Sequence, residues 1–141
     1  MHHRELVNPP DLHPAPGFSH IAIASGTKVV HFAGQVALAP DFGLVGGDDL
    51  YEQTRAAMRN VKVAMDAAEV AWDDIVRRTI YTLRPTEYET ITRAIDDVTG
   101  GADHPAQTIV GVTGLAVPGL LIEIECTAVT PSSAADARRS S

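Results

Sequence analysis

The chain has 141 residues, of which 45% are hydrophobic and 21% are charged. This length can bury one core but not two, and this composition is typical of a folded globular domain. The formal net charge of −7 argues against a surface that neutralises phosphate backbones, so we expect no nucleic-acid partner.

The cellular location is predicted from three further features. Cys126 is the single cysteine and cannot form an internal disulfide, and the polar, proline-rich opening of the chain does not resemble a signal peptide. No apolar run approaches the roughly 18 residues that a membrane helix needs. We therefore expect a cytoplasmic protein without a membrane segment.

The two ends of the chain differ from its middle. Residues 1–16 contain four of the nine prolines and little periodic pattern, which predicts an extended N-terminal arm. Residues 131–141 are rich in Ser, Ala and Arg and are predicted to form a disordered tail. The folded domain is therefore expected over residues 17–130.

The first half of this domain reads as two strands and a helix. Residues 19–24 and 29–36 have strand patterns and are separated by a turn, which predicts an antiparallel hairpin. A glycine-rich loop then ends at Asp48 and Asp49, either of which can cap a helix that begins at Leu50. Apolar residues recur along this helix at helical spacing as far as residue 68.

The second half reads as a strand, a helix and two strands. Residues 75–83 are rich in β-branched residues, and Pro85-Thr86 then opens a helix that ends at Gly100-Gly101. Strands are expected at 107–112 and 120–129. The order β-β-α-β-α-β-β predicts an α+β fold in which both helices pack on one face of a mixed sheet.

The last predicted strand has two chemically different faces. Its two-residue period places Ile122, Ile124, Cys126 and Ala128 on one side and Glu123, Glu125 and Thr127 on the other. The apolar side is expected to face the helices. The mixed acidic side suits a surface that is partly buried against another subunit.

At this point the residues match a family pattern. The matching segments are Gly17-Phe18-Ser19-His20, Phe32-Ala33-Gly34-Gln35-Val36, Gln53-Thr54-Arg55 with Asn60-Val61, Pro105-Ala106 with Thr108, and Ile122-Glu123-Ile124-Glu125-Cys126-Thr127-Ala128-Val129. In this order and spacing they resemble the RidA (YjgF) family over residues 8–129. The resemblance implies a chorismate-mutase-like fold, a homotrimer whose sheets form a central barrel, and sites in the clefts between subunits. It also implies hydrolysis of reactive enamines and imines to keto acids and ammonia, without a metal or organic cofactor.

One position departs from the family's chemistry. The arginine that holds the substrate carboxylate follows Pro-Ala in the family, and Gln107 stands there in this chain. Losing a charged two-point contact costs about 2 to 4 kcal/mol, or roughly 30-fold to 1000-fold in carboxylate binding. Glu123 matches the family's water-positioning carboxylate, whereas Glu125 is interpreted as structural.

Other departures make the expected site more apolar. Phe18 stands where many deaminating members have tyrosine, Thr92 where asparagine is common, and Ile109 where cysteine is often found. We expect these three residues to line the site with Gln107. The alternative for Phe18 is an ordinary core aromatic, and the alternative for Ile109 is a residue that only fills the sheet. Gln35 can supply an amide to a ligand or satisfy a backbone group, and the sequence does not separate these roles.

Two arginines and six histidines are further candidates for site residues. Arg84 and Arg93 are nearest in sequence to site-forming segments, but exposed loop or helix arginines are the simpler interpretation. The histidines have no metal-binding spacing, so no metal is expected.

Three functions follow from these residues. The first is a hydrolytic deaminase of small imine or enamine metabolites with an altered substrate range. The second is a trimer that binds a small metabolite without catalysis. The third, ribonuclease, is disfavoured by the acidic balance and the lack of a basic aromatic stripe.

Overall fold

The computed structural model describes residues 3–131. The strands are β1 (Arg4–Val7), β2 (Ile21–Ala24), β3 (Lys28–Val36), β4 (Ile75–Thr82), β5 (Ala106–Gly111) and β6 (Ile122–Thr130), and the helices are α1 (Leu50–Ala67), the short 3-10 helix η1 (Trp72–Asp74) and α2 (Tyr88–Thr99). Apart from residue 131, the predicted disordered tail lies outside the described residues.

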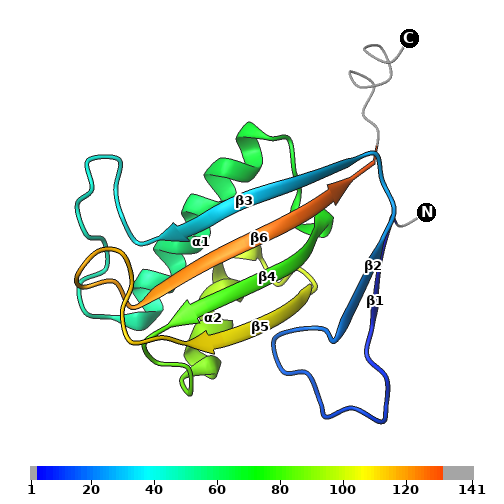
Figure 1. The fold of residues 1–141 in the computed structure, drawn as a ribbon, viewed down its shortest axis with the longest axis horizontal. Helices are drawn as coiled ribbons and strands as arrows, with labels where there is room; N and C mark the ends of the chain where they lie inside the picture. Colours follow the sequence, from blue (N-terminus) through cyan, green and yellow to red (C-terminus); the bar gives the residue numbers. More distant parts are fainter. Residues whose placement is uncertain (1–2, 132–141) are drawn as a thin grey trace.

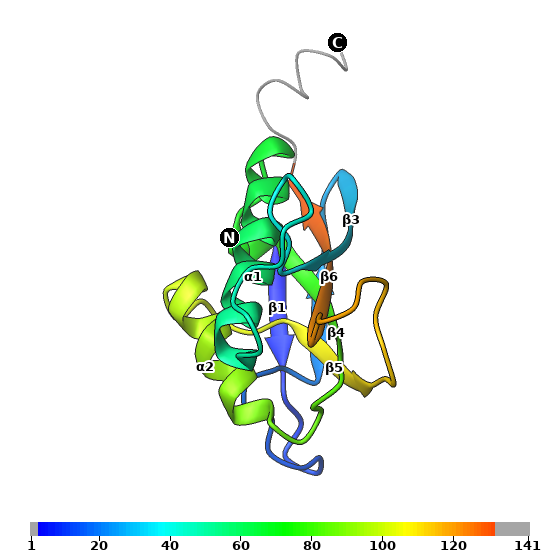
Figure 2. The same ribbon diagram turned by 90° about the vertical axis from the view of Figure 1, so that its left-hand side faces the viewer.

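Four strands form the main sheet in the order β3-β6-β4-β5. β4 and β5 are parallel, and the other neighbours are antiparallel. Helices α1 and α2 lie on the same side of this sheet (Figures 1 and 2). The predicted α+β class, with two helices on one face of a mixed sheet, is confirmed. None of the helices in residues 3–131 is long and apolar enough to cross a membrane.

The hairpin predicted from residues 19–24 and 29–36 is wrong. β2 pairs instead with β1, which lies inside the predicted arm, and β3 pairs with β6 from Lys28↔Thr130 onward. The strands β3 and β6 each have nine residues and match in length. β2 has only four residues and could pair with the backbone hydrogen-bonding groups of less than half of β3. The prediction missed β1 because this strand has only four residues, too few to show a clear two-residue alternation, and two prolines come shortly after it.

The helix α1 follows its predicted pattern. Asp49 is the N-cap, and its carboxylate accepts a hydrogen bond of 2.9 Å from the backbone N–H of Glu52. The face of α1 that contains Met58, Val61 and Met65 is fully buried. At the end of α2, Gly100 adopts a φ of 75°, the left-handed conformation that glycine tolerates, and ends the helix as predicted.

The core lies between the helices and one face of the sheet. In β6 the alternation is as predicted: Ile122 and Ile124 are fully buried, whereas Glu123 and Glu125 are half-buried on the other face. The opposite face therefore carries the acidic side chains and has no helix over it within residues 3–131 (Figure 2).

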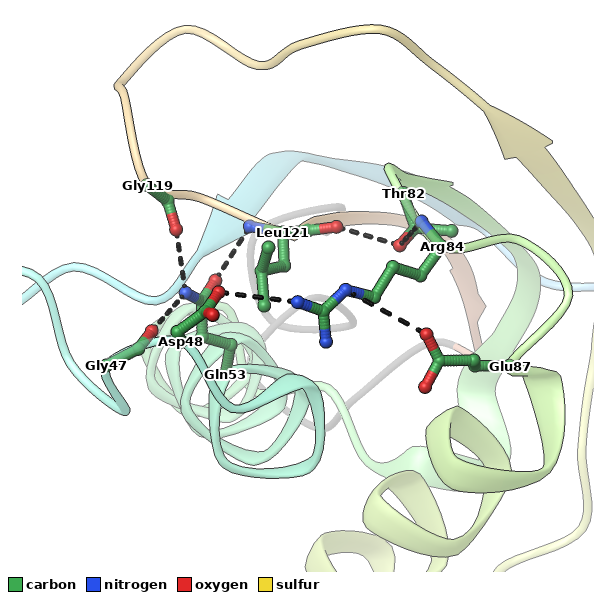
Figure 3. A network of polar contacts seen from close by, with 8 residues as sticks. All are labelled: Gly47, Asp48, Gln53, Thr82, Arg84, Glu87, Gly119 and Leu121. Atoms are coloured by element: carbon green, nitrogen blue, oxygen red, sulfur yellow. Dashed lines mark hydrogen bonds and ion pairs between the residues drawn. The ribbon is translucent and has the colours of Figure 1, made fainter.

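A buried glutamine joins the loops at the start of α1. The side-chain nitrogen of Gln53 donates to the carbonyl oxygens of Gly47 and Gly119 at 2.7 and 2.9 Å, and its oxygen accepts from the N–H of Leu121 at 2.9 Å. Figure 3 shows these contacts between the glycine-rich loop, α1 and the loop before β6. Because the amide is fully buried, the three hydrogen bonds hold loops that are distant in sequence at one end of the sheet.

Candidate functional site

A cavity of about 550 Å³ opens between the N-terminal segment, α2 and β5. It is lined by His13, Pro14, Pro16, Phe18, Pro85, Tyr88, Thr92, Gln107 and Ile109. Four of the five residues predicted to bind substrate, all except Gln35, lie on its wall. They come from three separate segments of the chain, so the fold brings them together.

The backbone explains why these four residues meet. Gln107 and Ile109 are two residues apart on β5 and therefore point to the same side of the sheet. Thr92 lies on α2, and the N-terminal segment crosses it at Gly17, which has a φ of 79°. A Cβ at Gly17 would be 2.4 Å from Oγ1 of Thr92, so only glycine lets the chain pass close enough to place Phe18 at the cavity.

The side chain of Gln107 is held from behind by an arginine. Arg78 is its registered neighbour on β4, and Nε of Arg78 donates to Oε1 of Gln107 at 2.5 Å. A guanidinium has only donors, so the amide oxygen must face it and the NH2 group must point the other way. Within residues 3–131, that NH2 group has no hydrogen-bond acceptor.

Arg78 belongs to a chain of polar contacts that ends on α2. Its Nη2 donates to Nδ1 of His104 at 2.9 Å and to the carbonyl oxygen of Gly17 at 3.3 Å. Nε2 of His104 in turn lies 2.9 Å from a carboxylate oxygen of Asp96. Because Nδ1 accepts from a cation, His104 is neutral with its proton on Nε2, which it donates to Asp96.

The electrostatics agree with this assignment. The side chain of Arg78 is only 4% exposed, and this burial lowers its pKa to about 10, so it remains charged at neutral pH. Burial and the charge of Arg78 lower the pKa of His104, which keeps the imidazole neutral. The buried cation thus lies between the neutral imidazole and the amide of Gln107.

Arg78 was missed by the sequence reasoning, although one signal pointed to it. Counting back in twos from Ile80 and Thr82 places Arg78 on the core face of its strand, where a charge needs a partner. Neither arginine that was considered reaches the cavity wall. Arg84 pairs with Asp48 and Glu87 at 3.3 and 3.8 Å (Figure 3), and the guanidinium of Arg93 lies 4.9 Å from the ring centre of Tyr51.

Glu123 lies on the opposite face of the sheet from the cavity. It pairs with Tyr81, which lies between the buried residues Ile80 and Thr82 of β4 and therefore points to the other face of the sheet. The carboxylate of Glu123 lies against Gly34 of β3. A Cβ at Gly34 would be 2.2 Å from a carboxylate oxygen of Glu123. Within one subunit, Glu123 and Gln107 are therefore on different sides of the sheet.

Two nearby polar groups are engaged in the structure. Gln35 donates from Nε2 to the carbonyl oxygen of Ala33 at 3.3 Å, so its amide satisfies a backbone group. Glu125 accepts a hydrogen bond of 2.7 Å from the Tyr81 hydroxyl, and this contact raises the pKa of the Tyr81 phenol. Within residues 3–131, no group of three or more His, Cys, Asp or Glu residues is arranged to hold a metal ion.

The chain matches one family model over most of its length. The family model described as endoribonuclease L-PSP matches residues 10–130. The chain belongs to the RidA (YjgF) family. The match begins within the predicted arm and includes every residue on the cavity wall.

Individual relatives of this RidA-family chain cover most of its length. A structure of a conserved Rid family protein of unknown function, YyfB from Yersinia pestis, is 37% identical, with a TM-score of 0.83, and covers 90% of this chain and 98% of its own. A protein of Lactococcus lactis named putative regulator AldR is 31% identical over 74% of this chain and 81% of its own length. A RutC family protein of Pyrococcus horikoshii is 29% identical over 76% of this chain and 82% of its own length.

Proposed function

We propose that this chain is a hydrolytic deaminase of small imine or enamine metabolites whose substrate range differs from that of deaminases with an arginine clamp. One observation carries the proposal: Phe18, Thr92, Gln107 and Ile109, all predicted from the family pattern, line one cavity. A cavity of this volume suits a small metabolite.

The proposed site is completed by another copy of the chain. Glu123 is on the sheet face opposite Gln107, and that face has no helix over it among the described residues. We propose a homotrimer in which Glu123 of one subunit reaches the cavity of the next. The half-buried acids on this face then lie at the edge of a subunit interface.

Glu123 would act as general base and then as general acid. It takes a proton from a water molecule while the water oxygen bonds to the C=N carbon, and the protonated Glu123 then gives this proton to the nitrogen, which becomes an amine. The resulting carbinolamine loses ammonia and leaves a carbonyl, so that C=NH and H2O become C=O and NH3. Such proton transfer contributes typically 10²-fold to 10⁴-fold to the rate.

The altered substrate range follows from the cavity wall. Within residues 3–131 of one subunit, the wall contains no Lys, Arg, Asp or Glu side chain, and Gln107 offers an uncharged amide. A substrate carboxylate should bind roughly 30-fold to 1000-fold more weakly than it would to arginine. We therefore expect weak or no turnover of 2-aminoacrylate-derived imines.

The test measures ammonia and carbonyl formation from a panel of small imines. Glu123→Gln should reduce the rate about 100-fold or more. Glu125→Gln is the matched control, because it changes a carboxylate on the same strand face and leaves the Tyr81 hydroxyl an acceptor. Rapid hydrolysis in a coupled threonine dehydratase assay, unchanged in Gln107→Ala, would contradict the proposal.

A second candidate is a trimer that binds a small metabolite in this cavity without catalysis. The mostly apolar wall supports it, as does the relative that carries the name of a putative regulator. In that case Glu123→Gln should leave ligand affinity nearly unchanged, and no imine in the panel should be hydrolysed. Ribonuclease activity remains the least favoured candidate because the net charge is −7.

The remaining predictions belong to the same proposal. The protein is expected to act in the cytoplasm on a small molecule, without a metal or organic cofactor. Fractionation of cells and activity after treatment with a chelator test these two expectations.

A further inference from the structure

The inference concerns the buried contact between Arg78 and Gln107, and it rests on the proposed function only in using the same cavity. We propose that Arg78 is a positioning residue that fixes the Gln107 amide with its NH2 group toward the cavity. We further propose that the cavity therefore prefers small 2-oxo amides or esters, and the corresponding imines, to 2-oxo carboxylates.

The side-chain amide of Gln107 has one stable orientation. Rotating its amide by 180° would place the NH2 group against the guanidinium of Arg78, where two donors would face each other. Arg78 itself cannot move aside easily, since it is 4% exposed and also bonded to His104 and Gly17. Gln107 thus presents its NH2 group, a hydrogen-bond donor, to the cavity, while its amide oxygen faces Arg78.

The contact with Arg78 makes the NH2 group of Gln107 a stronger hydrogen-bond donor without giving it a charge. An amide whose oxygen accepts from a buried cation is polarised, and its N–H groups become better donors. The charge of Arg78 is offset on its far side by Asp96, which His104 connects to it. A ligand therefore meets a strong, uncharged hydrogen-bond donor, and the charges of Arg78 and Asp96 behind it cancel.

The two kinds of ligand differ in what they lose on entering the cavity. Among residues 3–131 of one subunit, the wall has no Lys or Arg side chain, so a carboxylate loses much of its hydration there without gaining a contact with either cation. A neutral carbonyl oxygen loses much less hydration and needs one or two donors. The NH2 group of Gln107 supplies them, so the balance favours the neutral acceptor.

The test uses two probes of nearly equal size, 2-oxobutanamide and 2-oxobutanoate, in equilibrium binding measured by ligand-observed NMR. The unmodified protein should bind the amide at least tenfold more tightly than the carboxylate. Arg78→Thr should reduce amide affinity about tenfold, the value of one hydrogen bond that is no longer held in place. Arg78→Lys, which keeps a cationic donor on this strand, should restore part of that affinity.

A double variant tests the same argument in reverse. Gln107→Arg combined with Arg78→Thr places one guanidinium on the cavity wall and removes the buried one, so the preference should change to 2-oxobutanoate. The side-chain NH2 resonances of Gln107 provide a signature that general destabilisation does not produce. They should move on binding the amide and shift in Arg78→Thr.

The outcomes separate this inference from the proposed function. Equal or tighter binding of 2-oxobutanoate by the unmodified protein would overturn the inference, as would an unchanged preference in folded Arg78→Thr. If Arg78→Thr does not fold, Gln107→Met decides, because it removes the donor and should abolish the preference. Absence of imine hydrolysis together with the expected binding preference would refute the deaminase alone.

Discussion

The substitution Gly34→Ala should strongly reduce the proposed imine hydrolysis without unfolding the protein. Gly34 lies on β3 directly against the carboxylate of Glu123, and a Cβ there would be 2.2 Å from one carboxylate oxygen. Contacts of a real Cβ are almost never below 3.0 Å. The backbone of Gly34 has no positive φ that would exclude alanine, so the added methyl group is the only change.

The size of the effect follows from how far the carboxylate must move. To reach ordinary contact at 3.4 Å, it must withdraw by about 1 Å, and a glutamate side chain can do so by rotation. A misplacement of about 1 Å of a catalytic group reduces the rate roughly 100-fold. The free energy of unfolding should change little, because the three atoms nearest to the added Cβ all belong to the flexible side chain of Glu123 and none to the backbone.

The assay measures kcat for imine hydrolysis together with urea unfolding and the assembly mass. Gly114→Ala is the matched control, since a Cβ at Gly114 would meet no atom within 4 Å. Glu123→Gln defines the rate that remains without the base. The reasoning is refuted if Gly34→Ala keeps the full rate while Glu123→Gln loses it.

Three further predictions concern stability. Gln53→Met should cost about 3 kcal/mol of unfolding free energy, because it leaves the N–H of Leu121 and two carbonyl oxygens without partners; a loss near zero in urea unfolding would contradict it. Asp49→Ala should cost about 1 kcal/mol by removing the N-cap, whereas Asp48→Ala, which loses only an exposed ion pair, should cost less. The pKa of His104 is lower in the folded protein than its usual value near 6.5. As the pH falls below about 6.5, the unfolded chain therefore binds more protons than the folded protein does, and the free energy of unfolding decreases. Urea unfolding between about pH 7 and pH 5 should show a smaller decrease for His104→Gln than for the unmodified protein or His20→Gln, and equal slopes would count against this assignment.

Much of the fold could be predicted because it depends on local pattern. The helical spacing of α1, the cap at Asp49 and the glycine at residue 100 specify their helix ends through neighbouring residues alone. The two-residue alternation of β6 likewise assigned Ile124 to the core and Glu123 to the other face. Strand pairing was not predictable in the same way, because β3 pairs with β6, which is distant in sequence, and not with the neighbouring β2, and no local pattern distinguishes the two partners.

By itself, the sequence determined that an uncharged amide, Gln107, stands at the position that the family resemblance assigns to an arginine, and it predicted that Phe18, Thr92 and Ile109 lie near it. The other residues of the cavity wall were not predicted. Only the tertiary structure decided what lies behind that amide. The contact between Arg78 and Gln107 depends on the parallel register of β4 and β5, and the one with His104 depends on the path of the loop before β5. These are contacts between residues far apart in the chain, and a buried charge finds its partners only when the whole sheet has assembled.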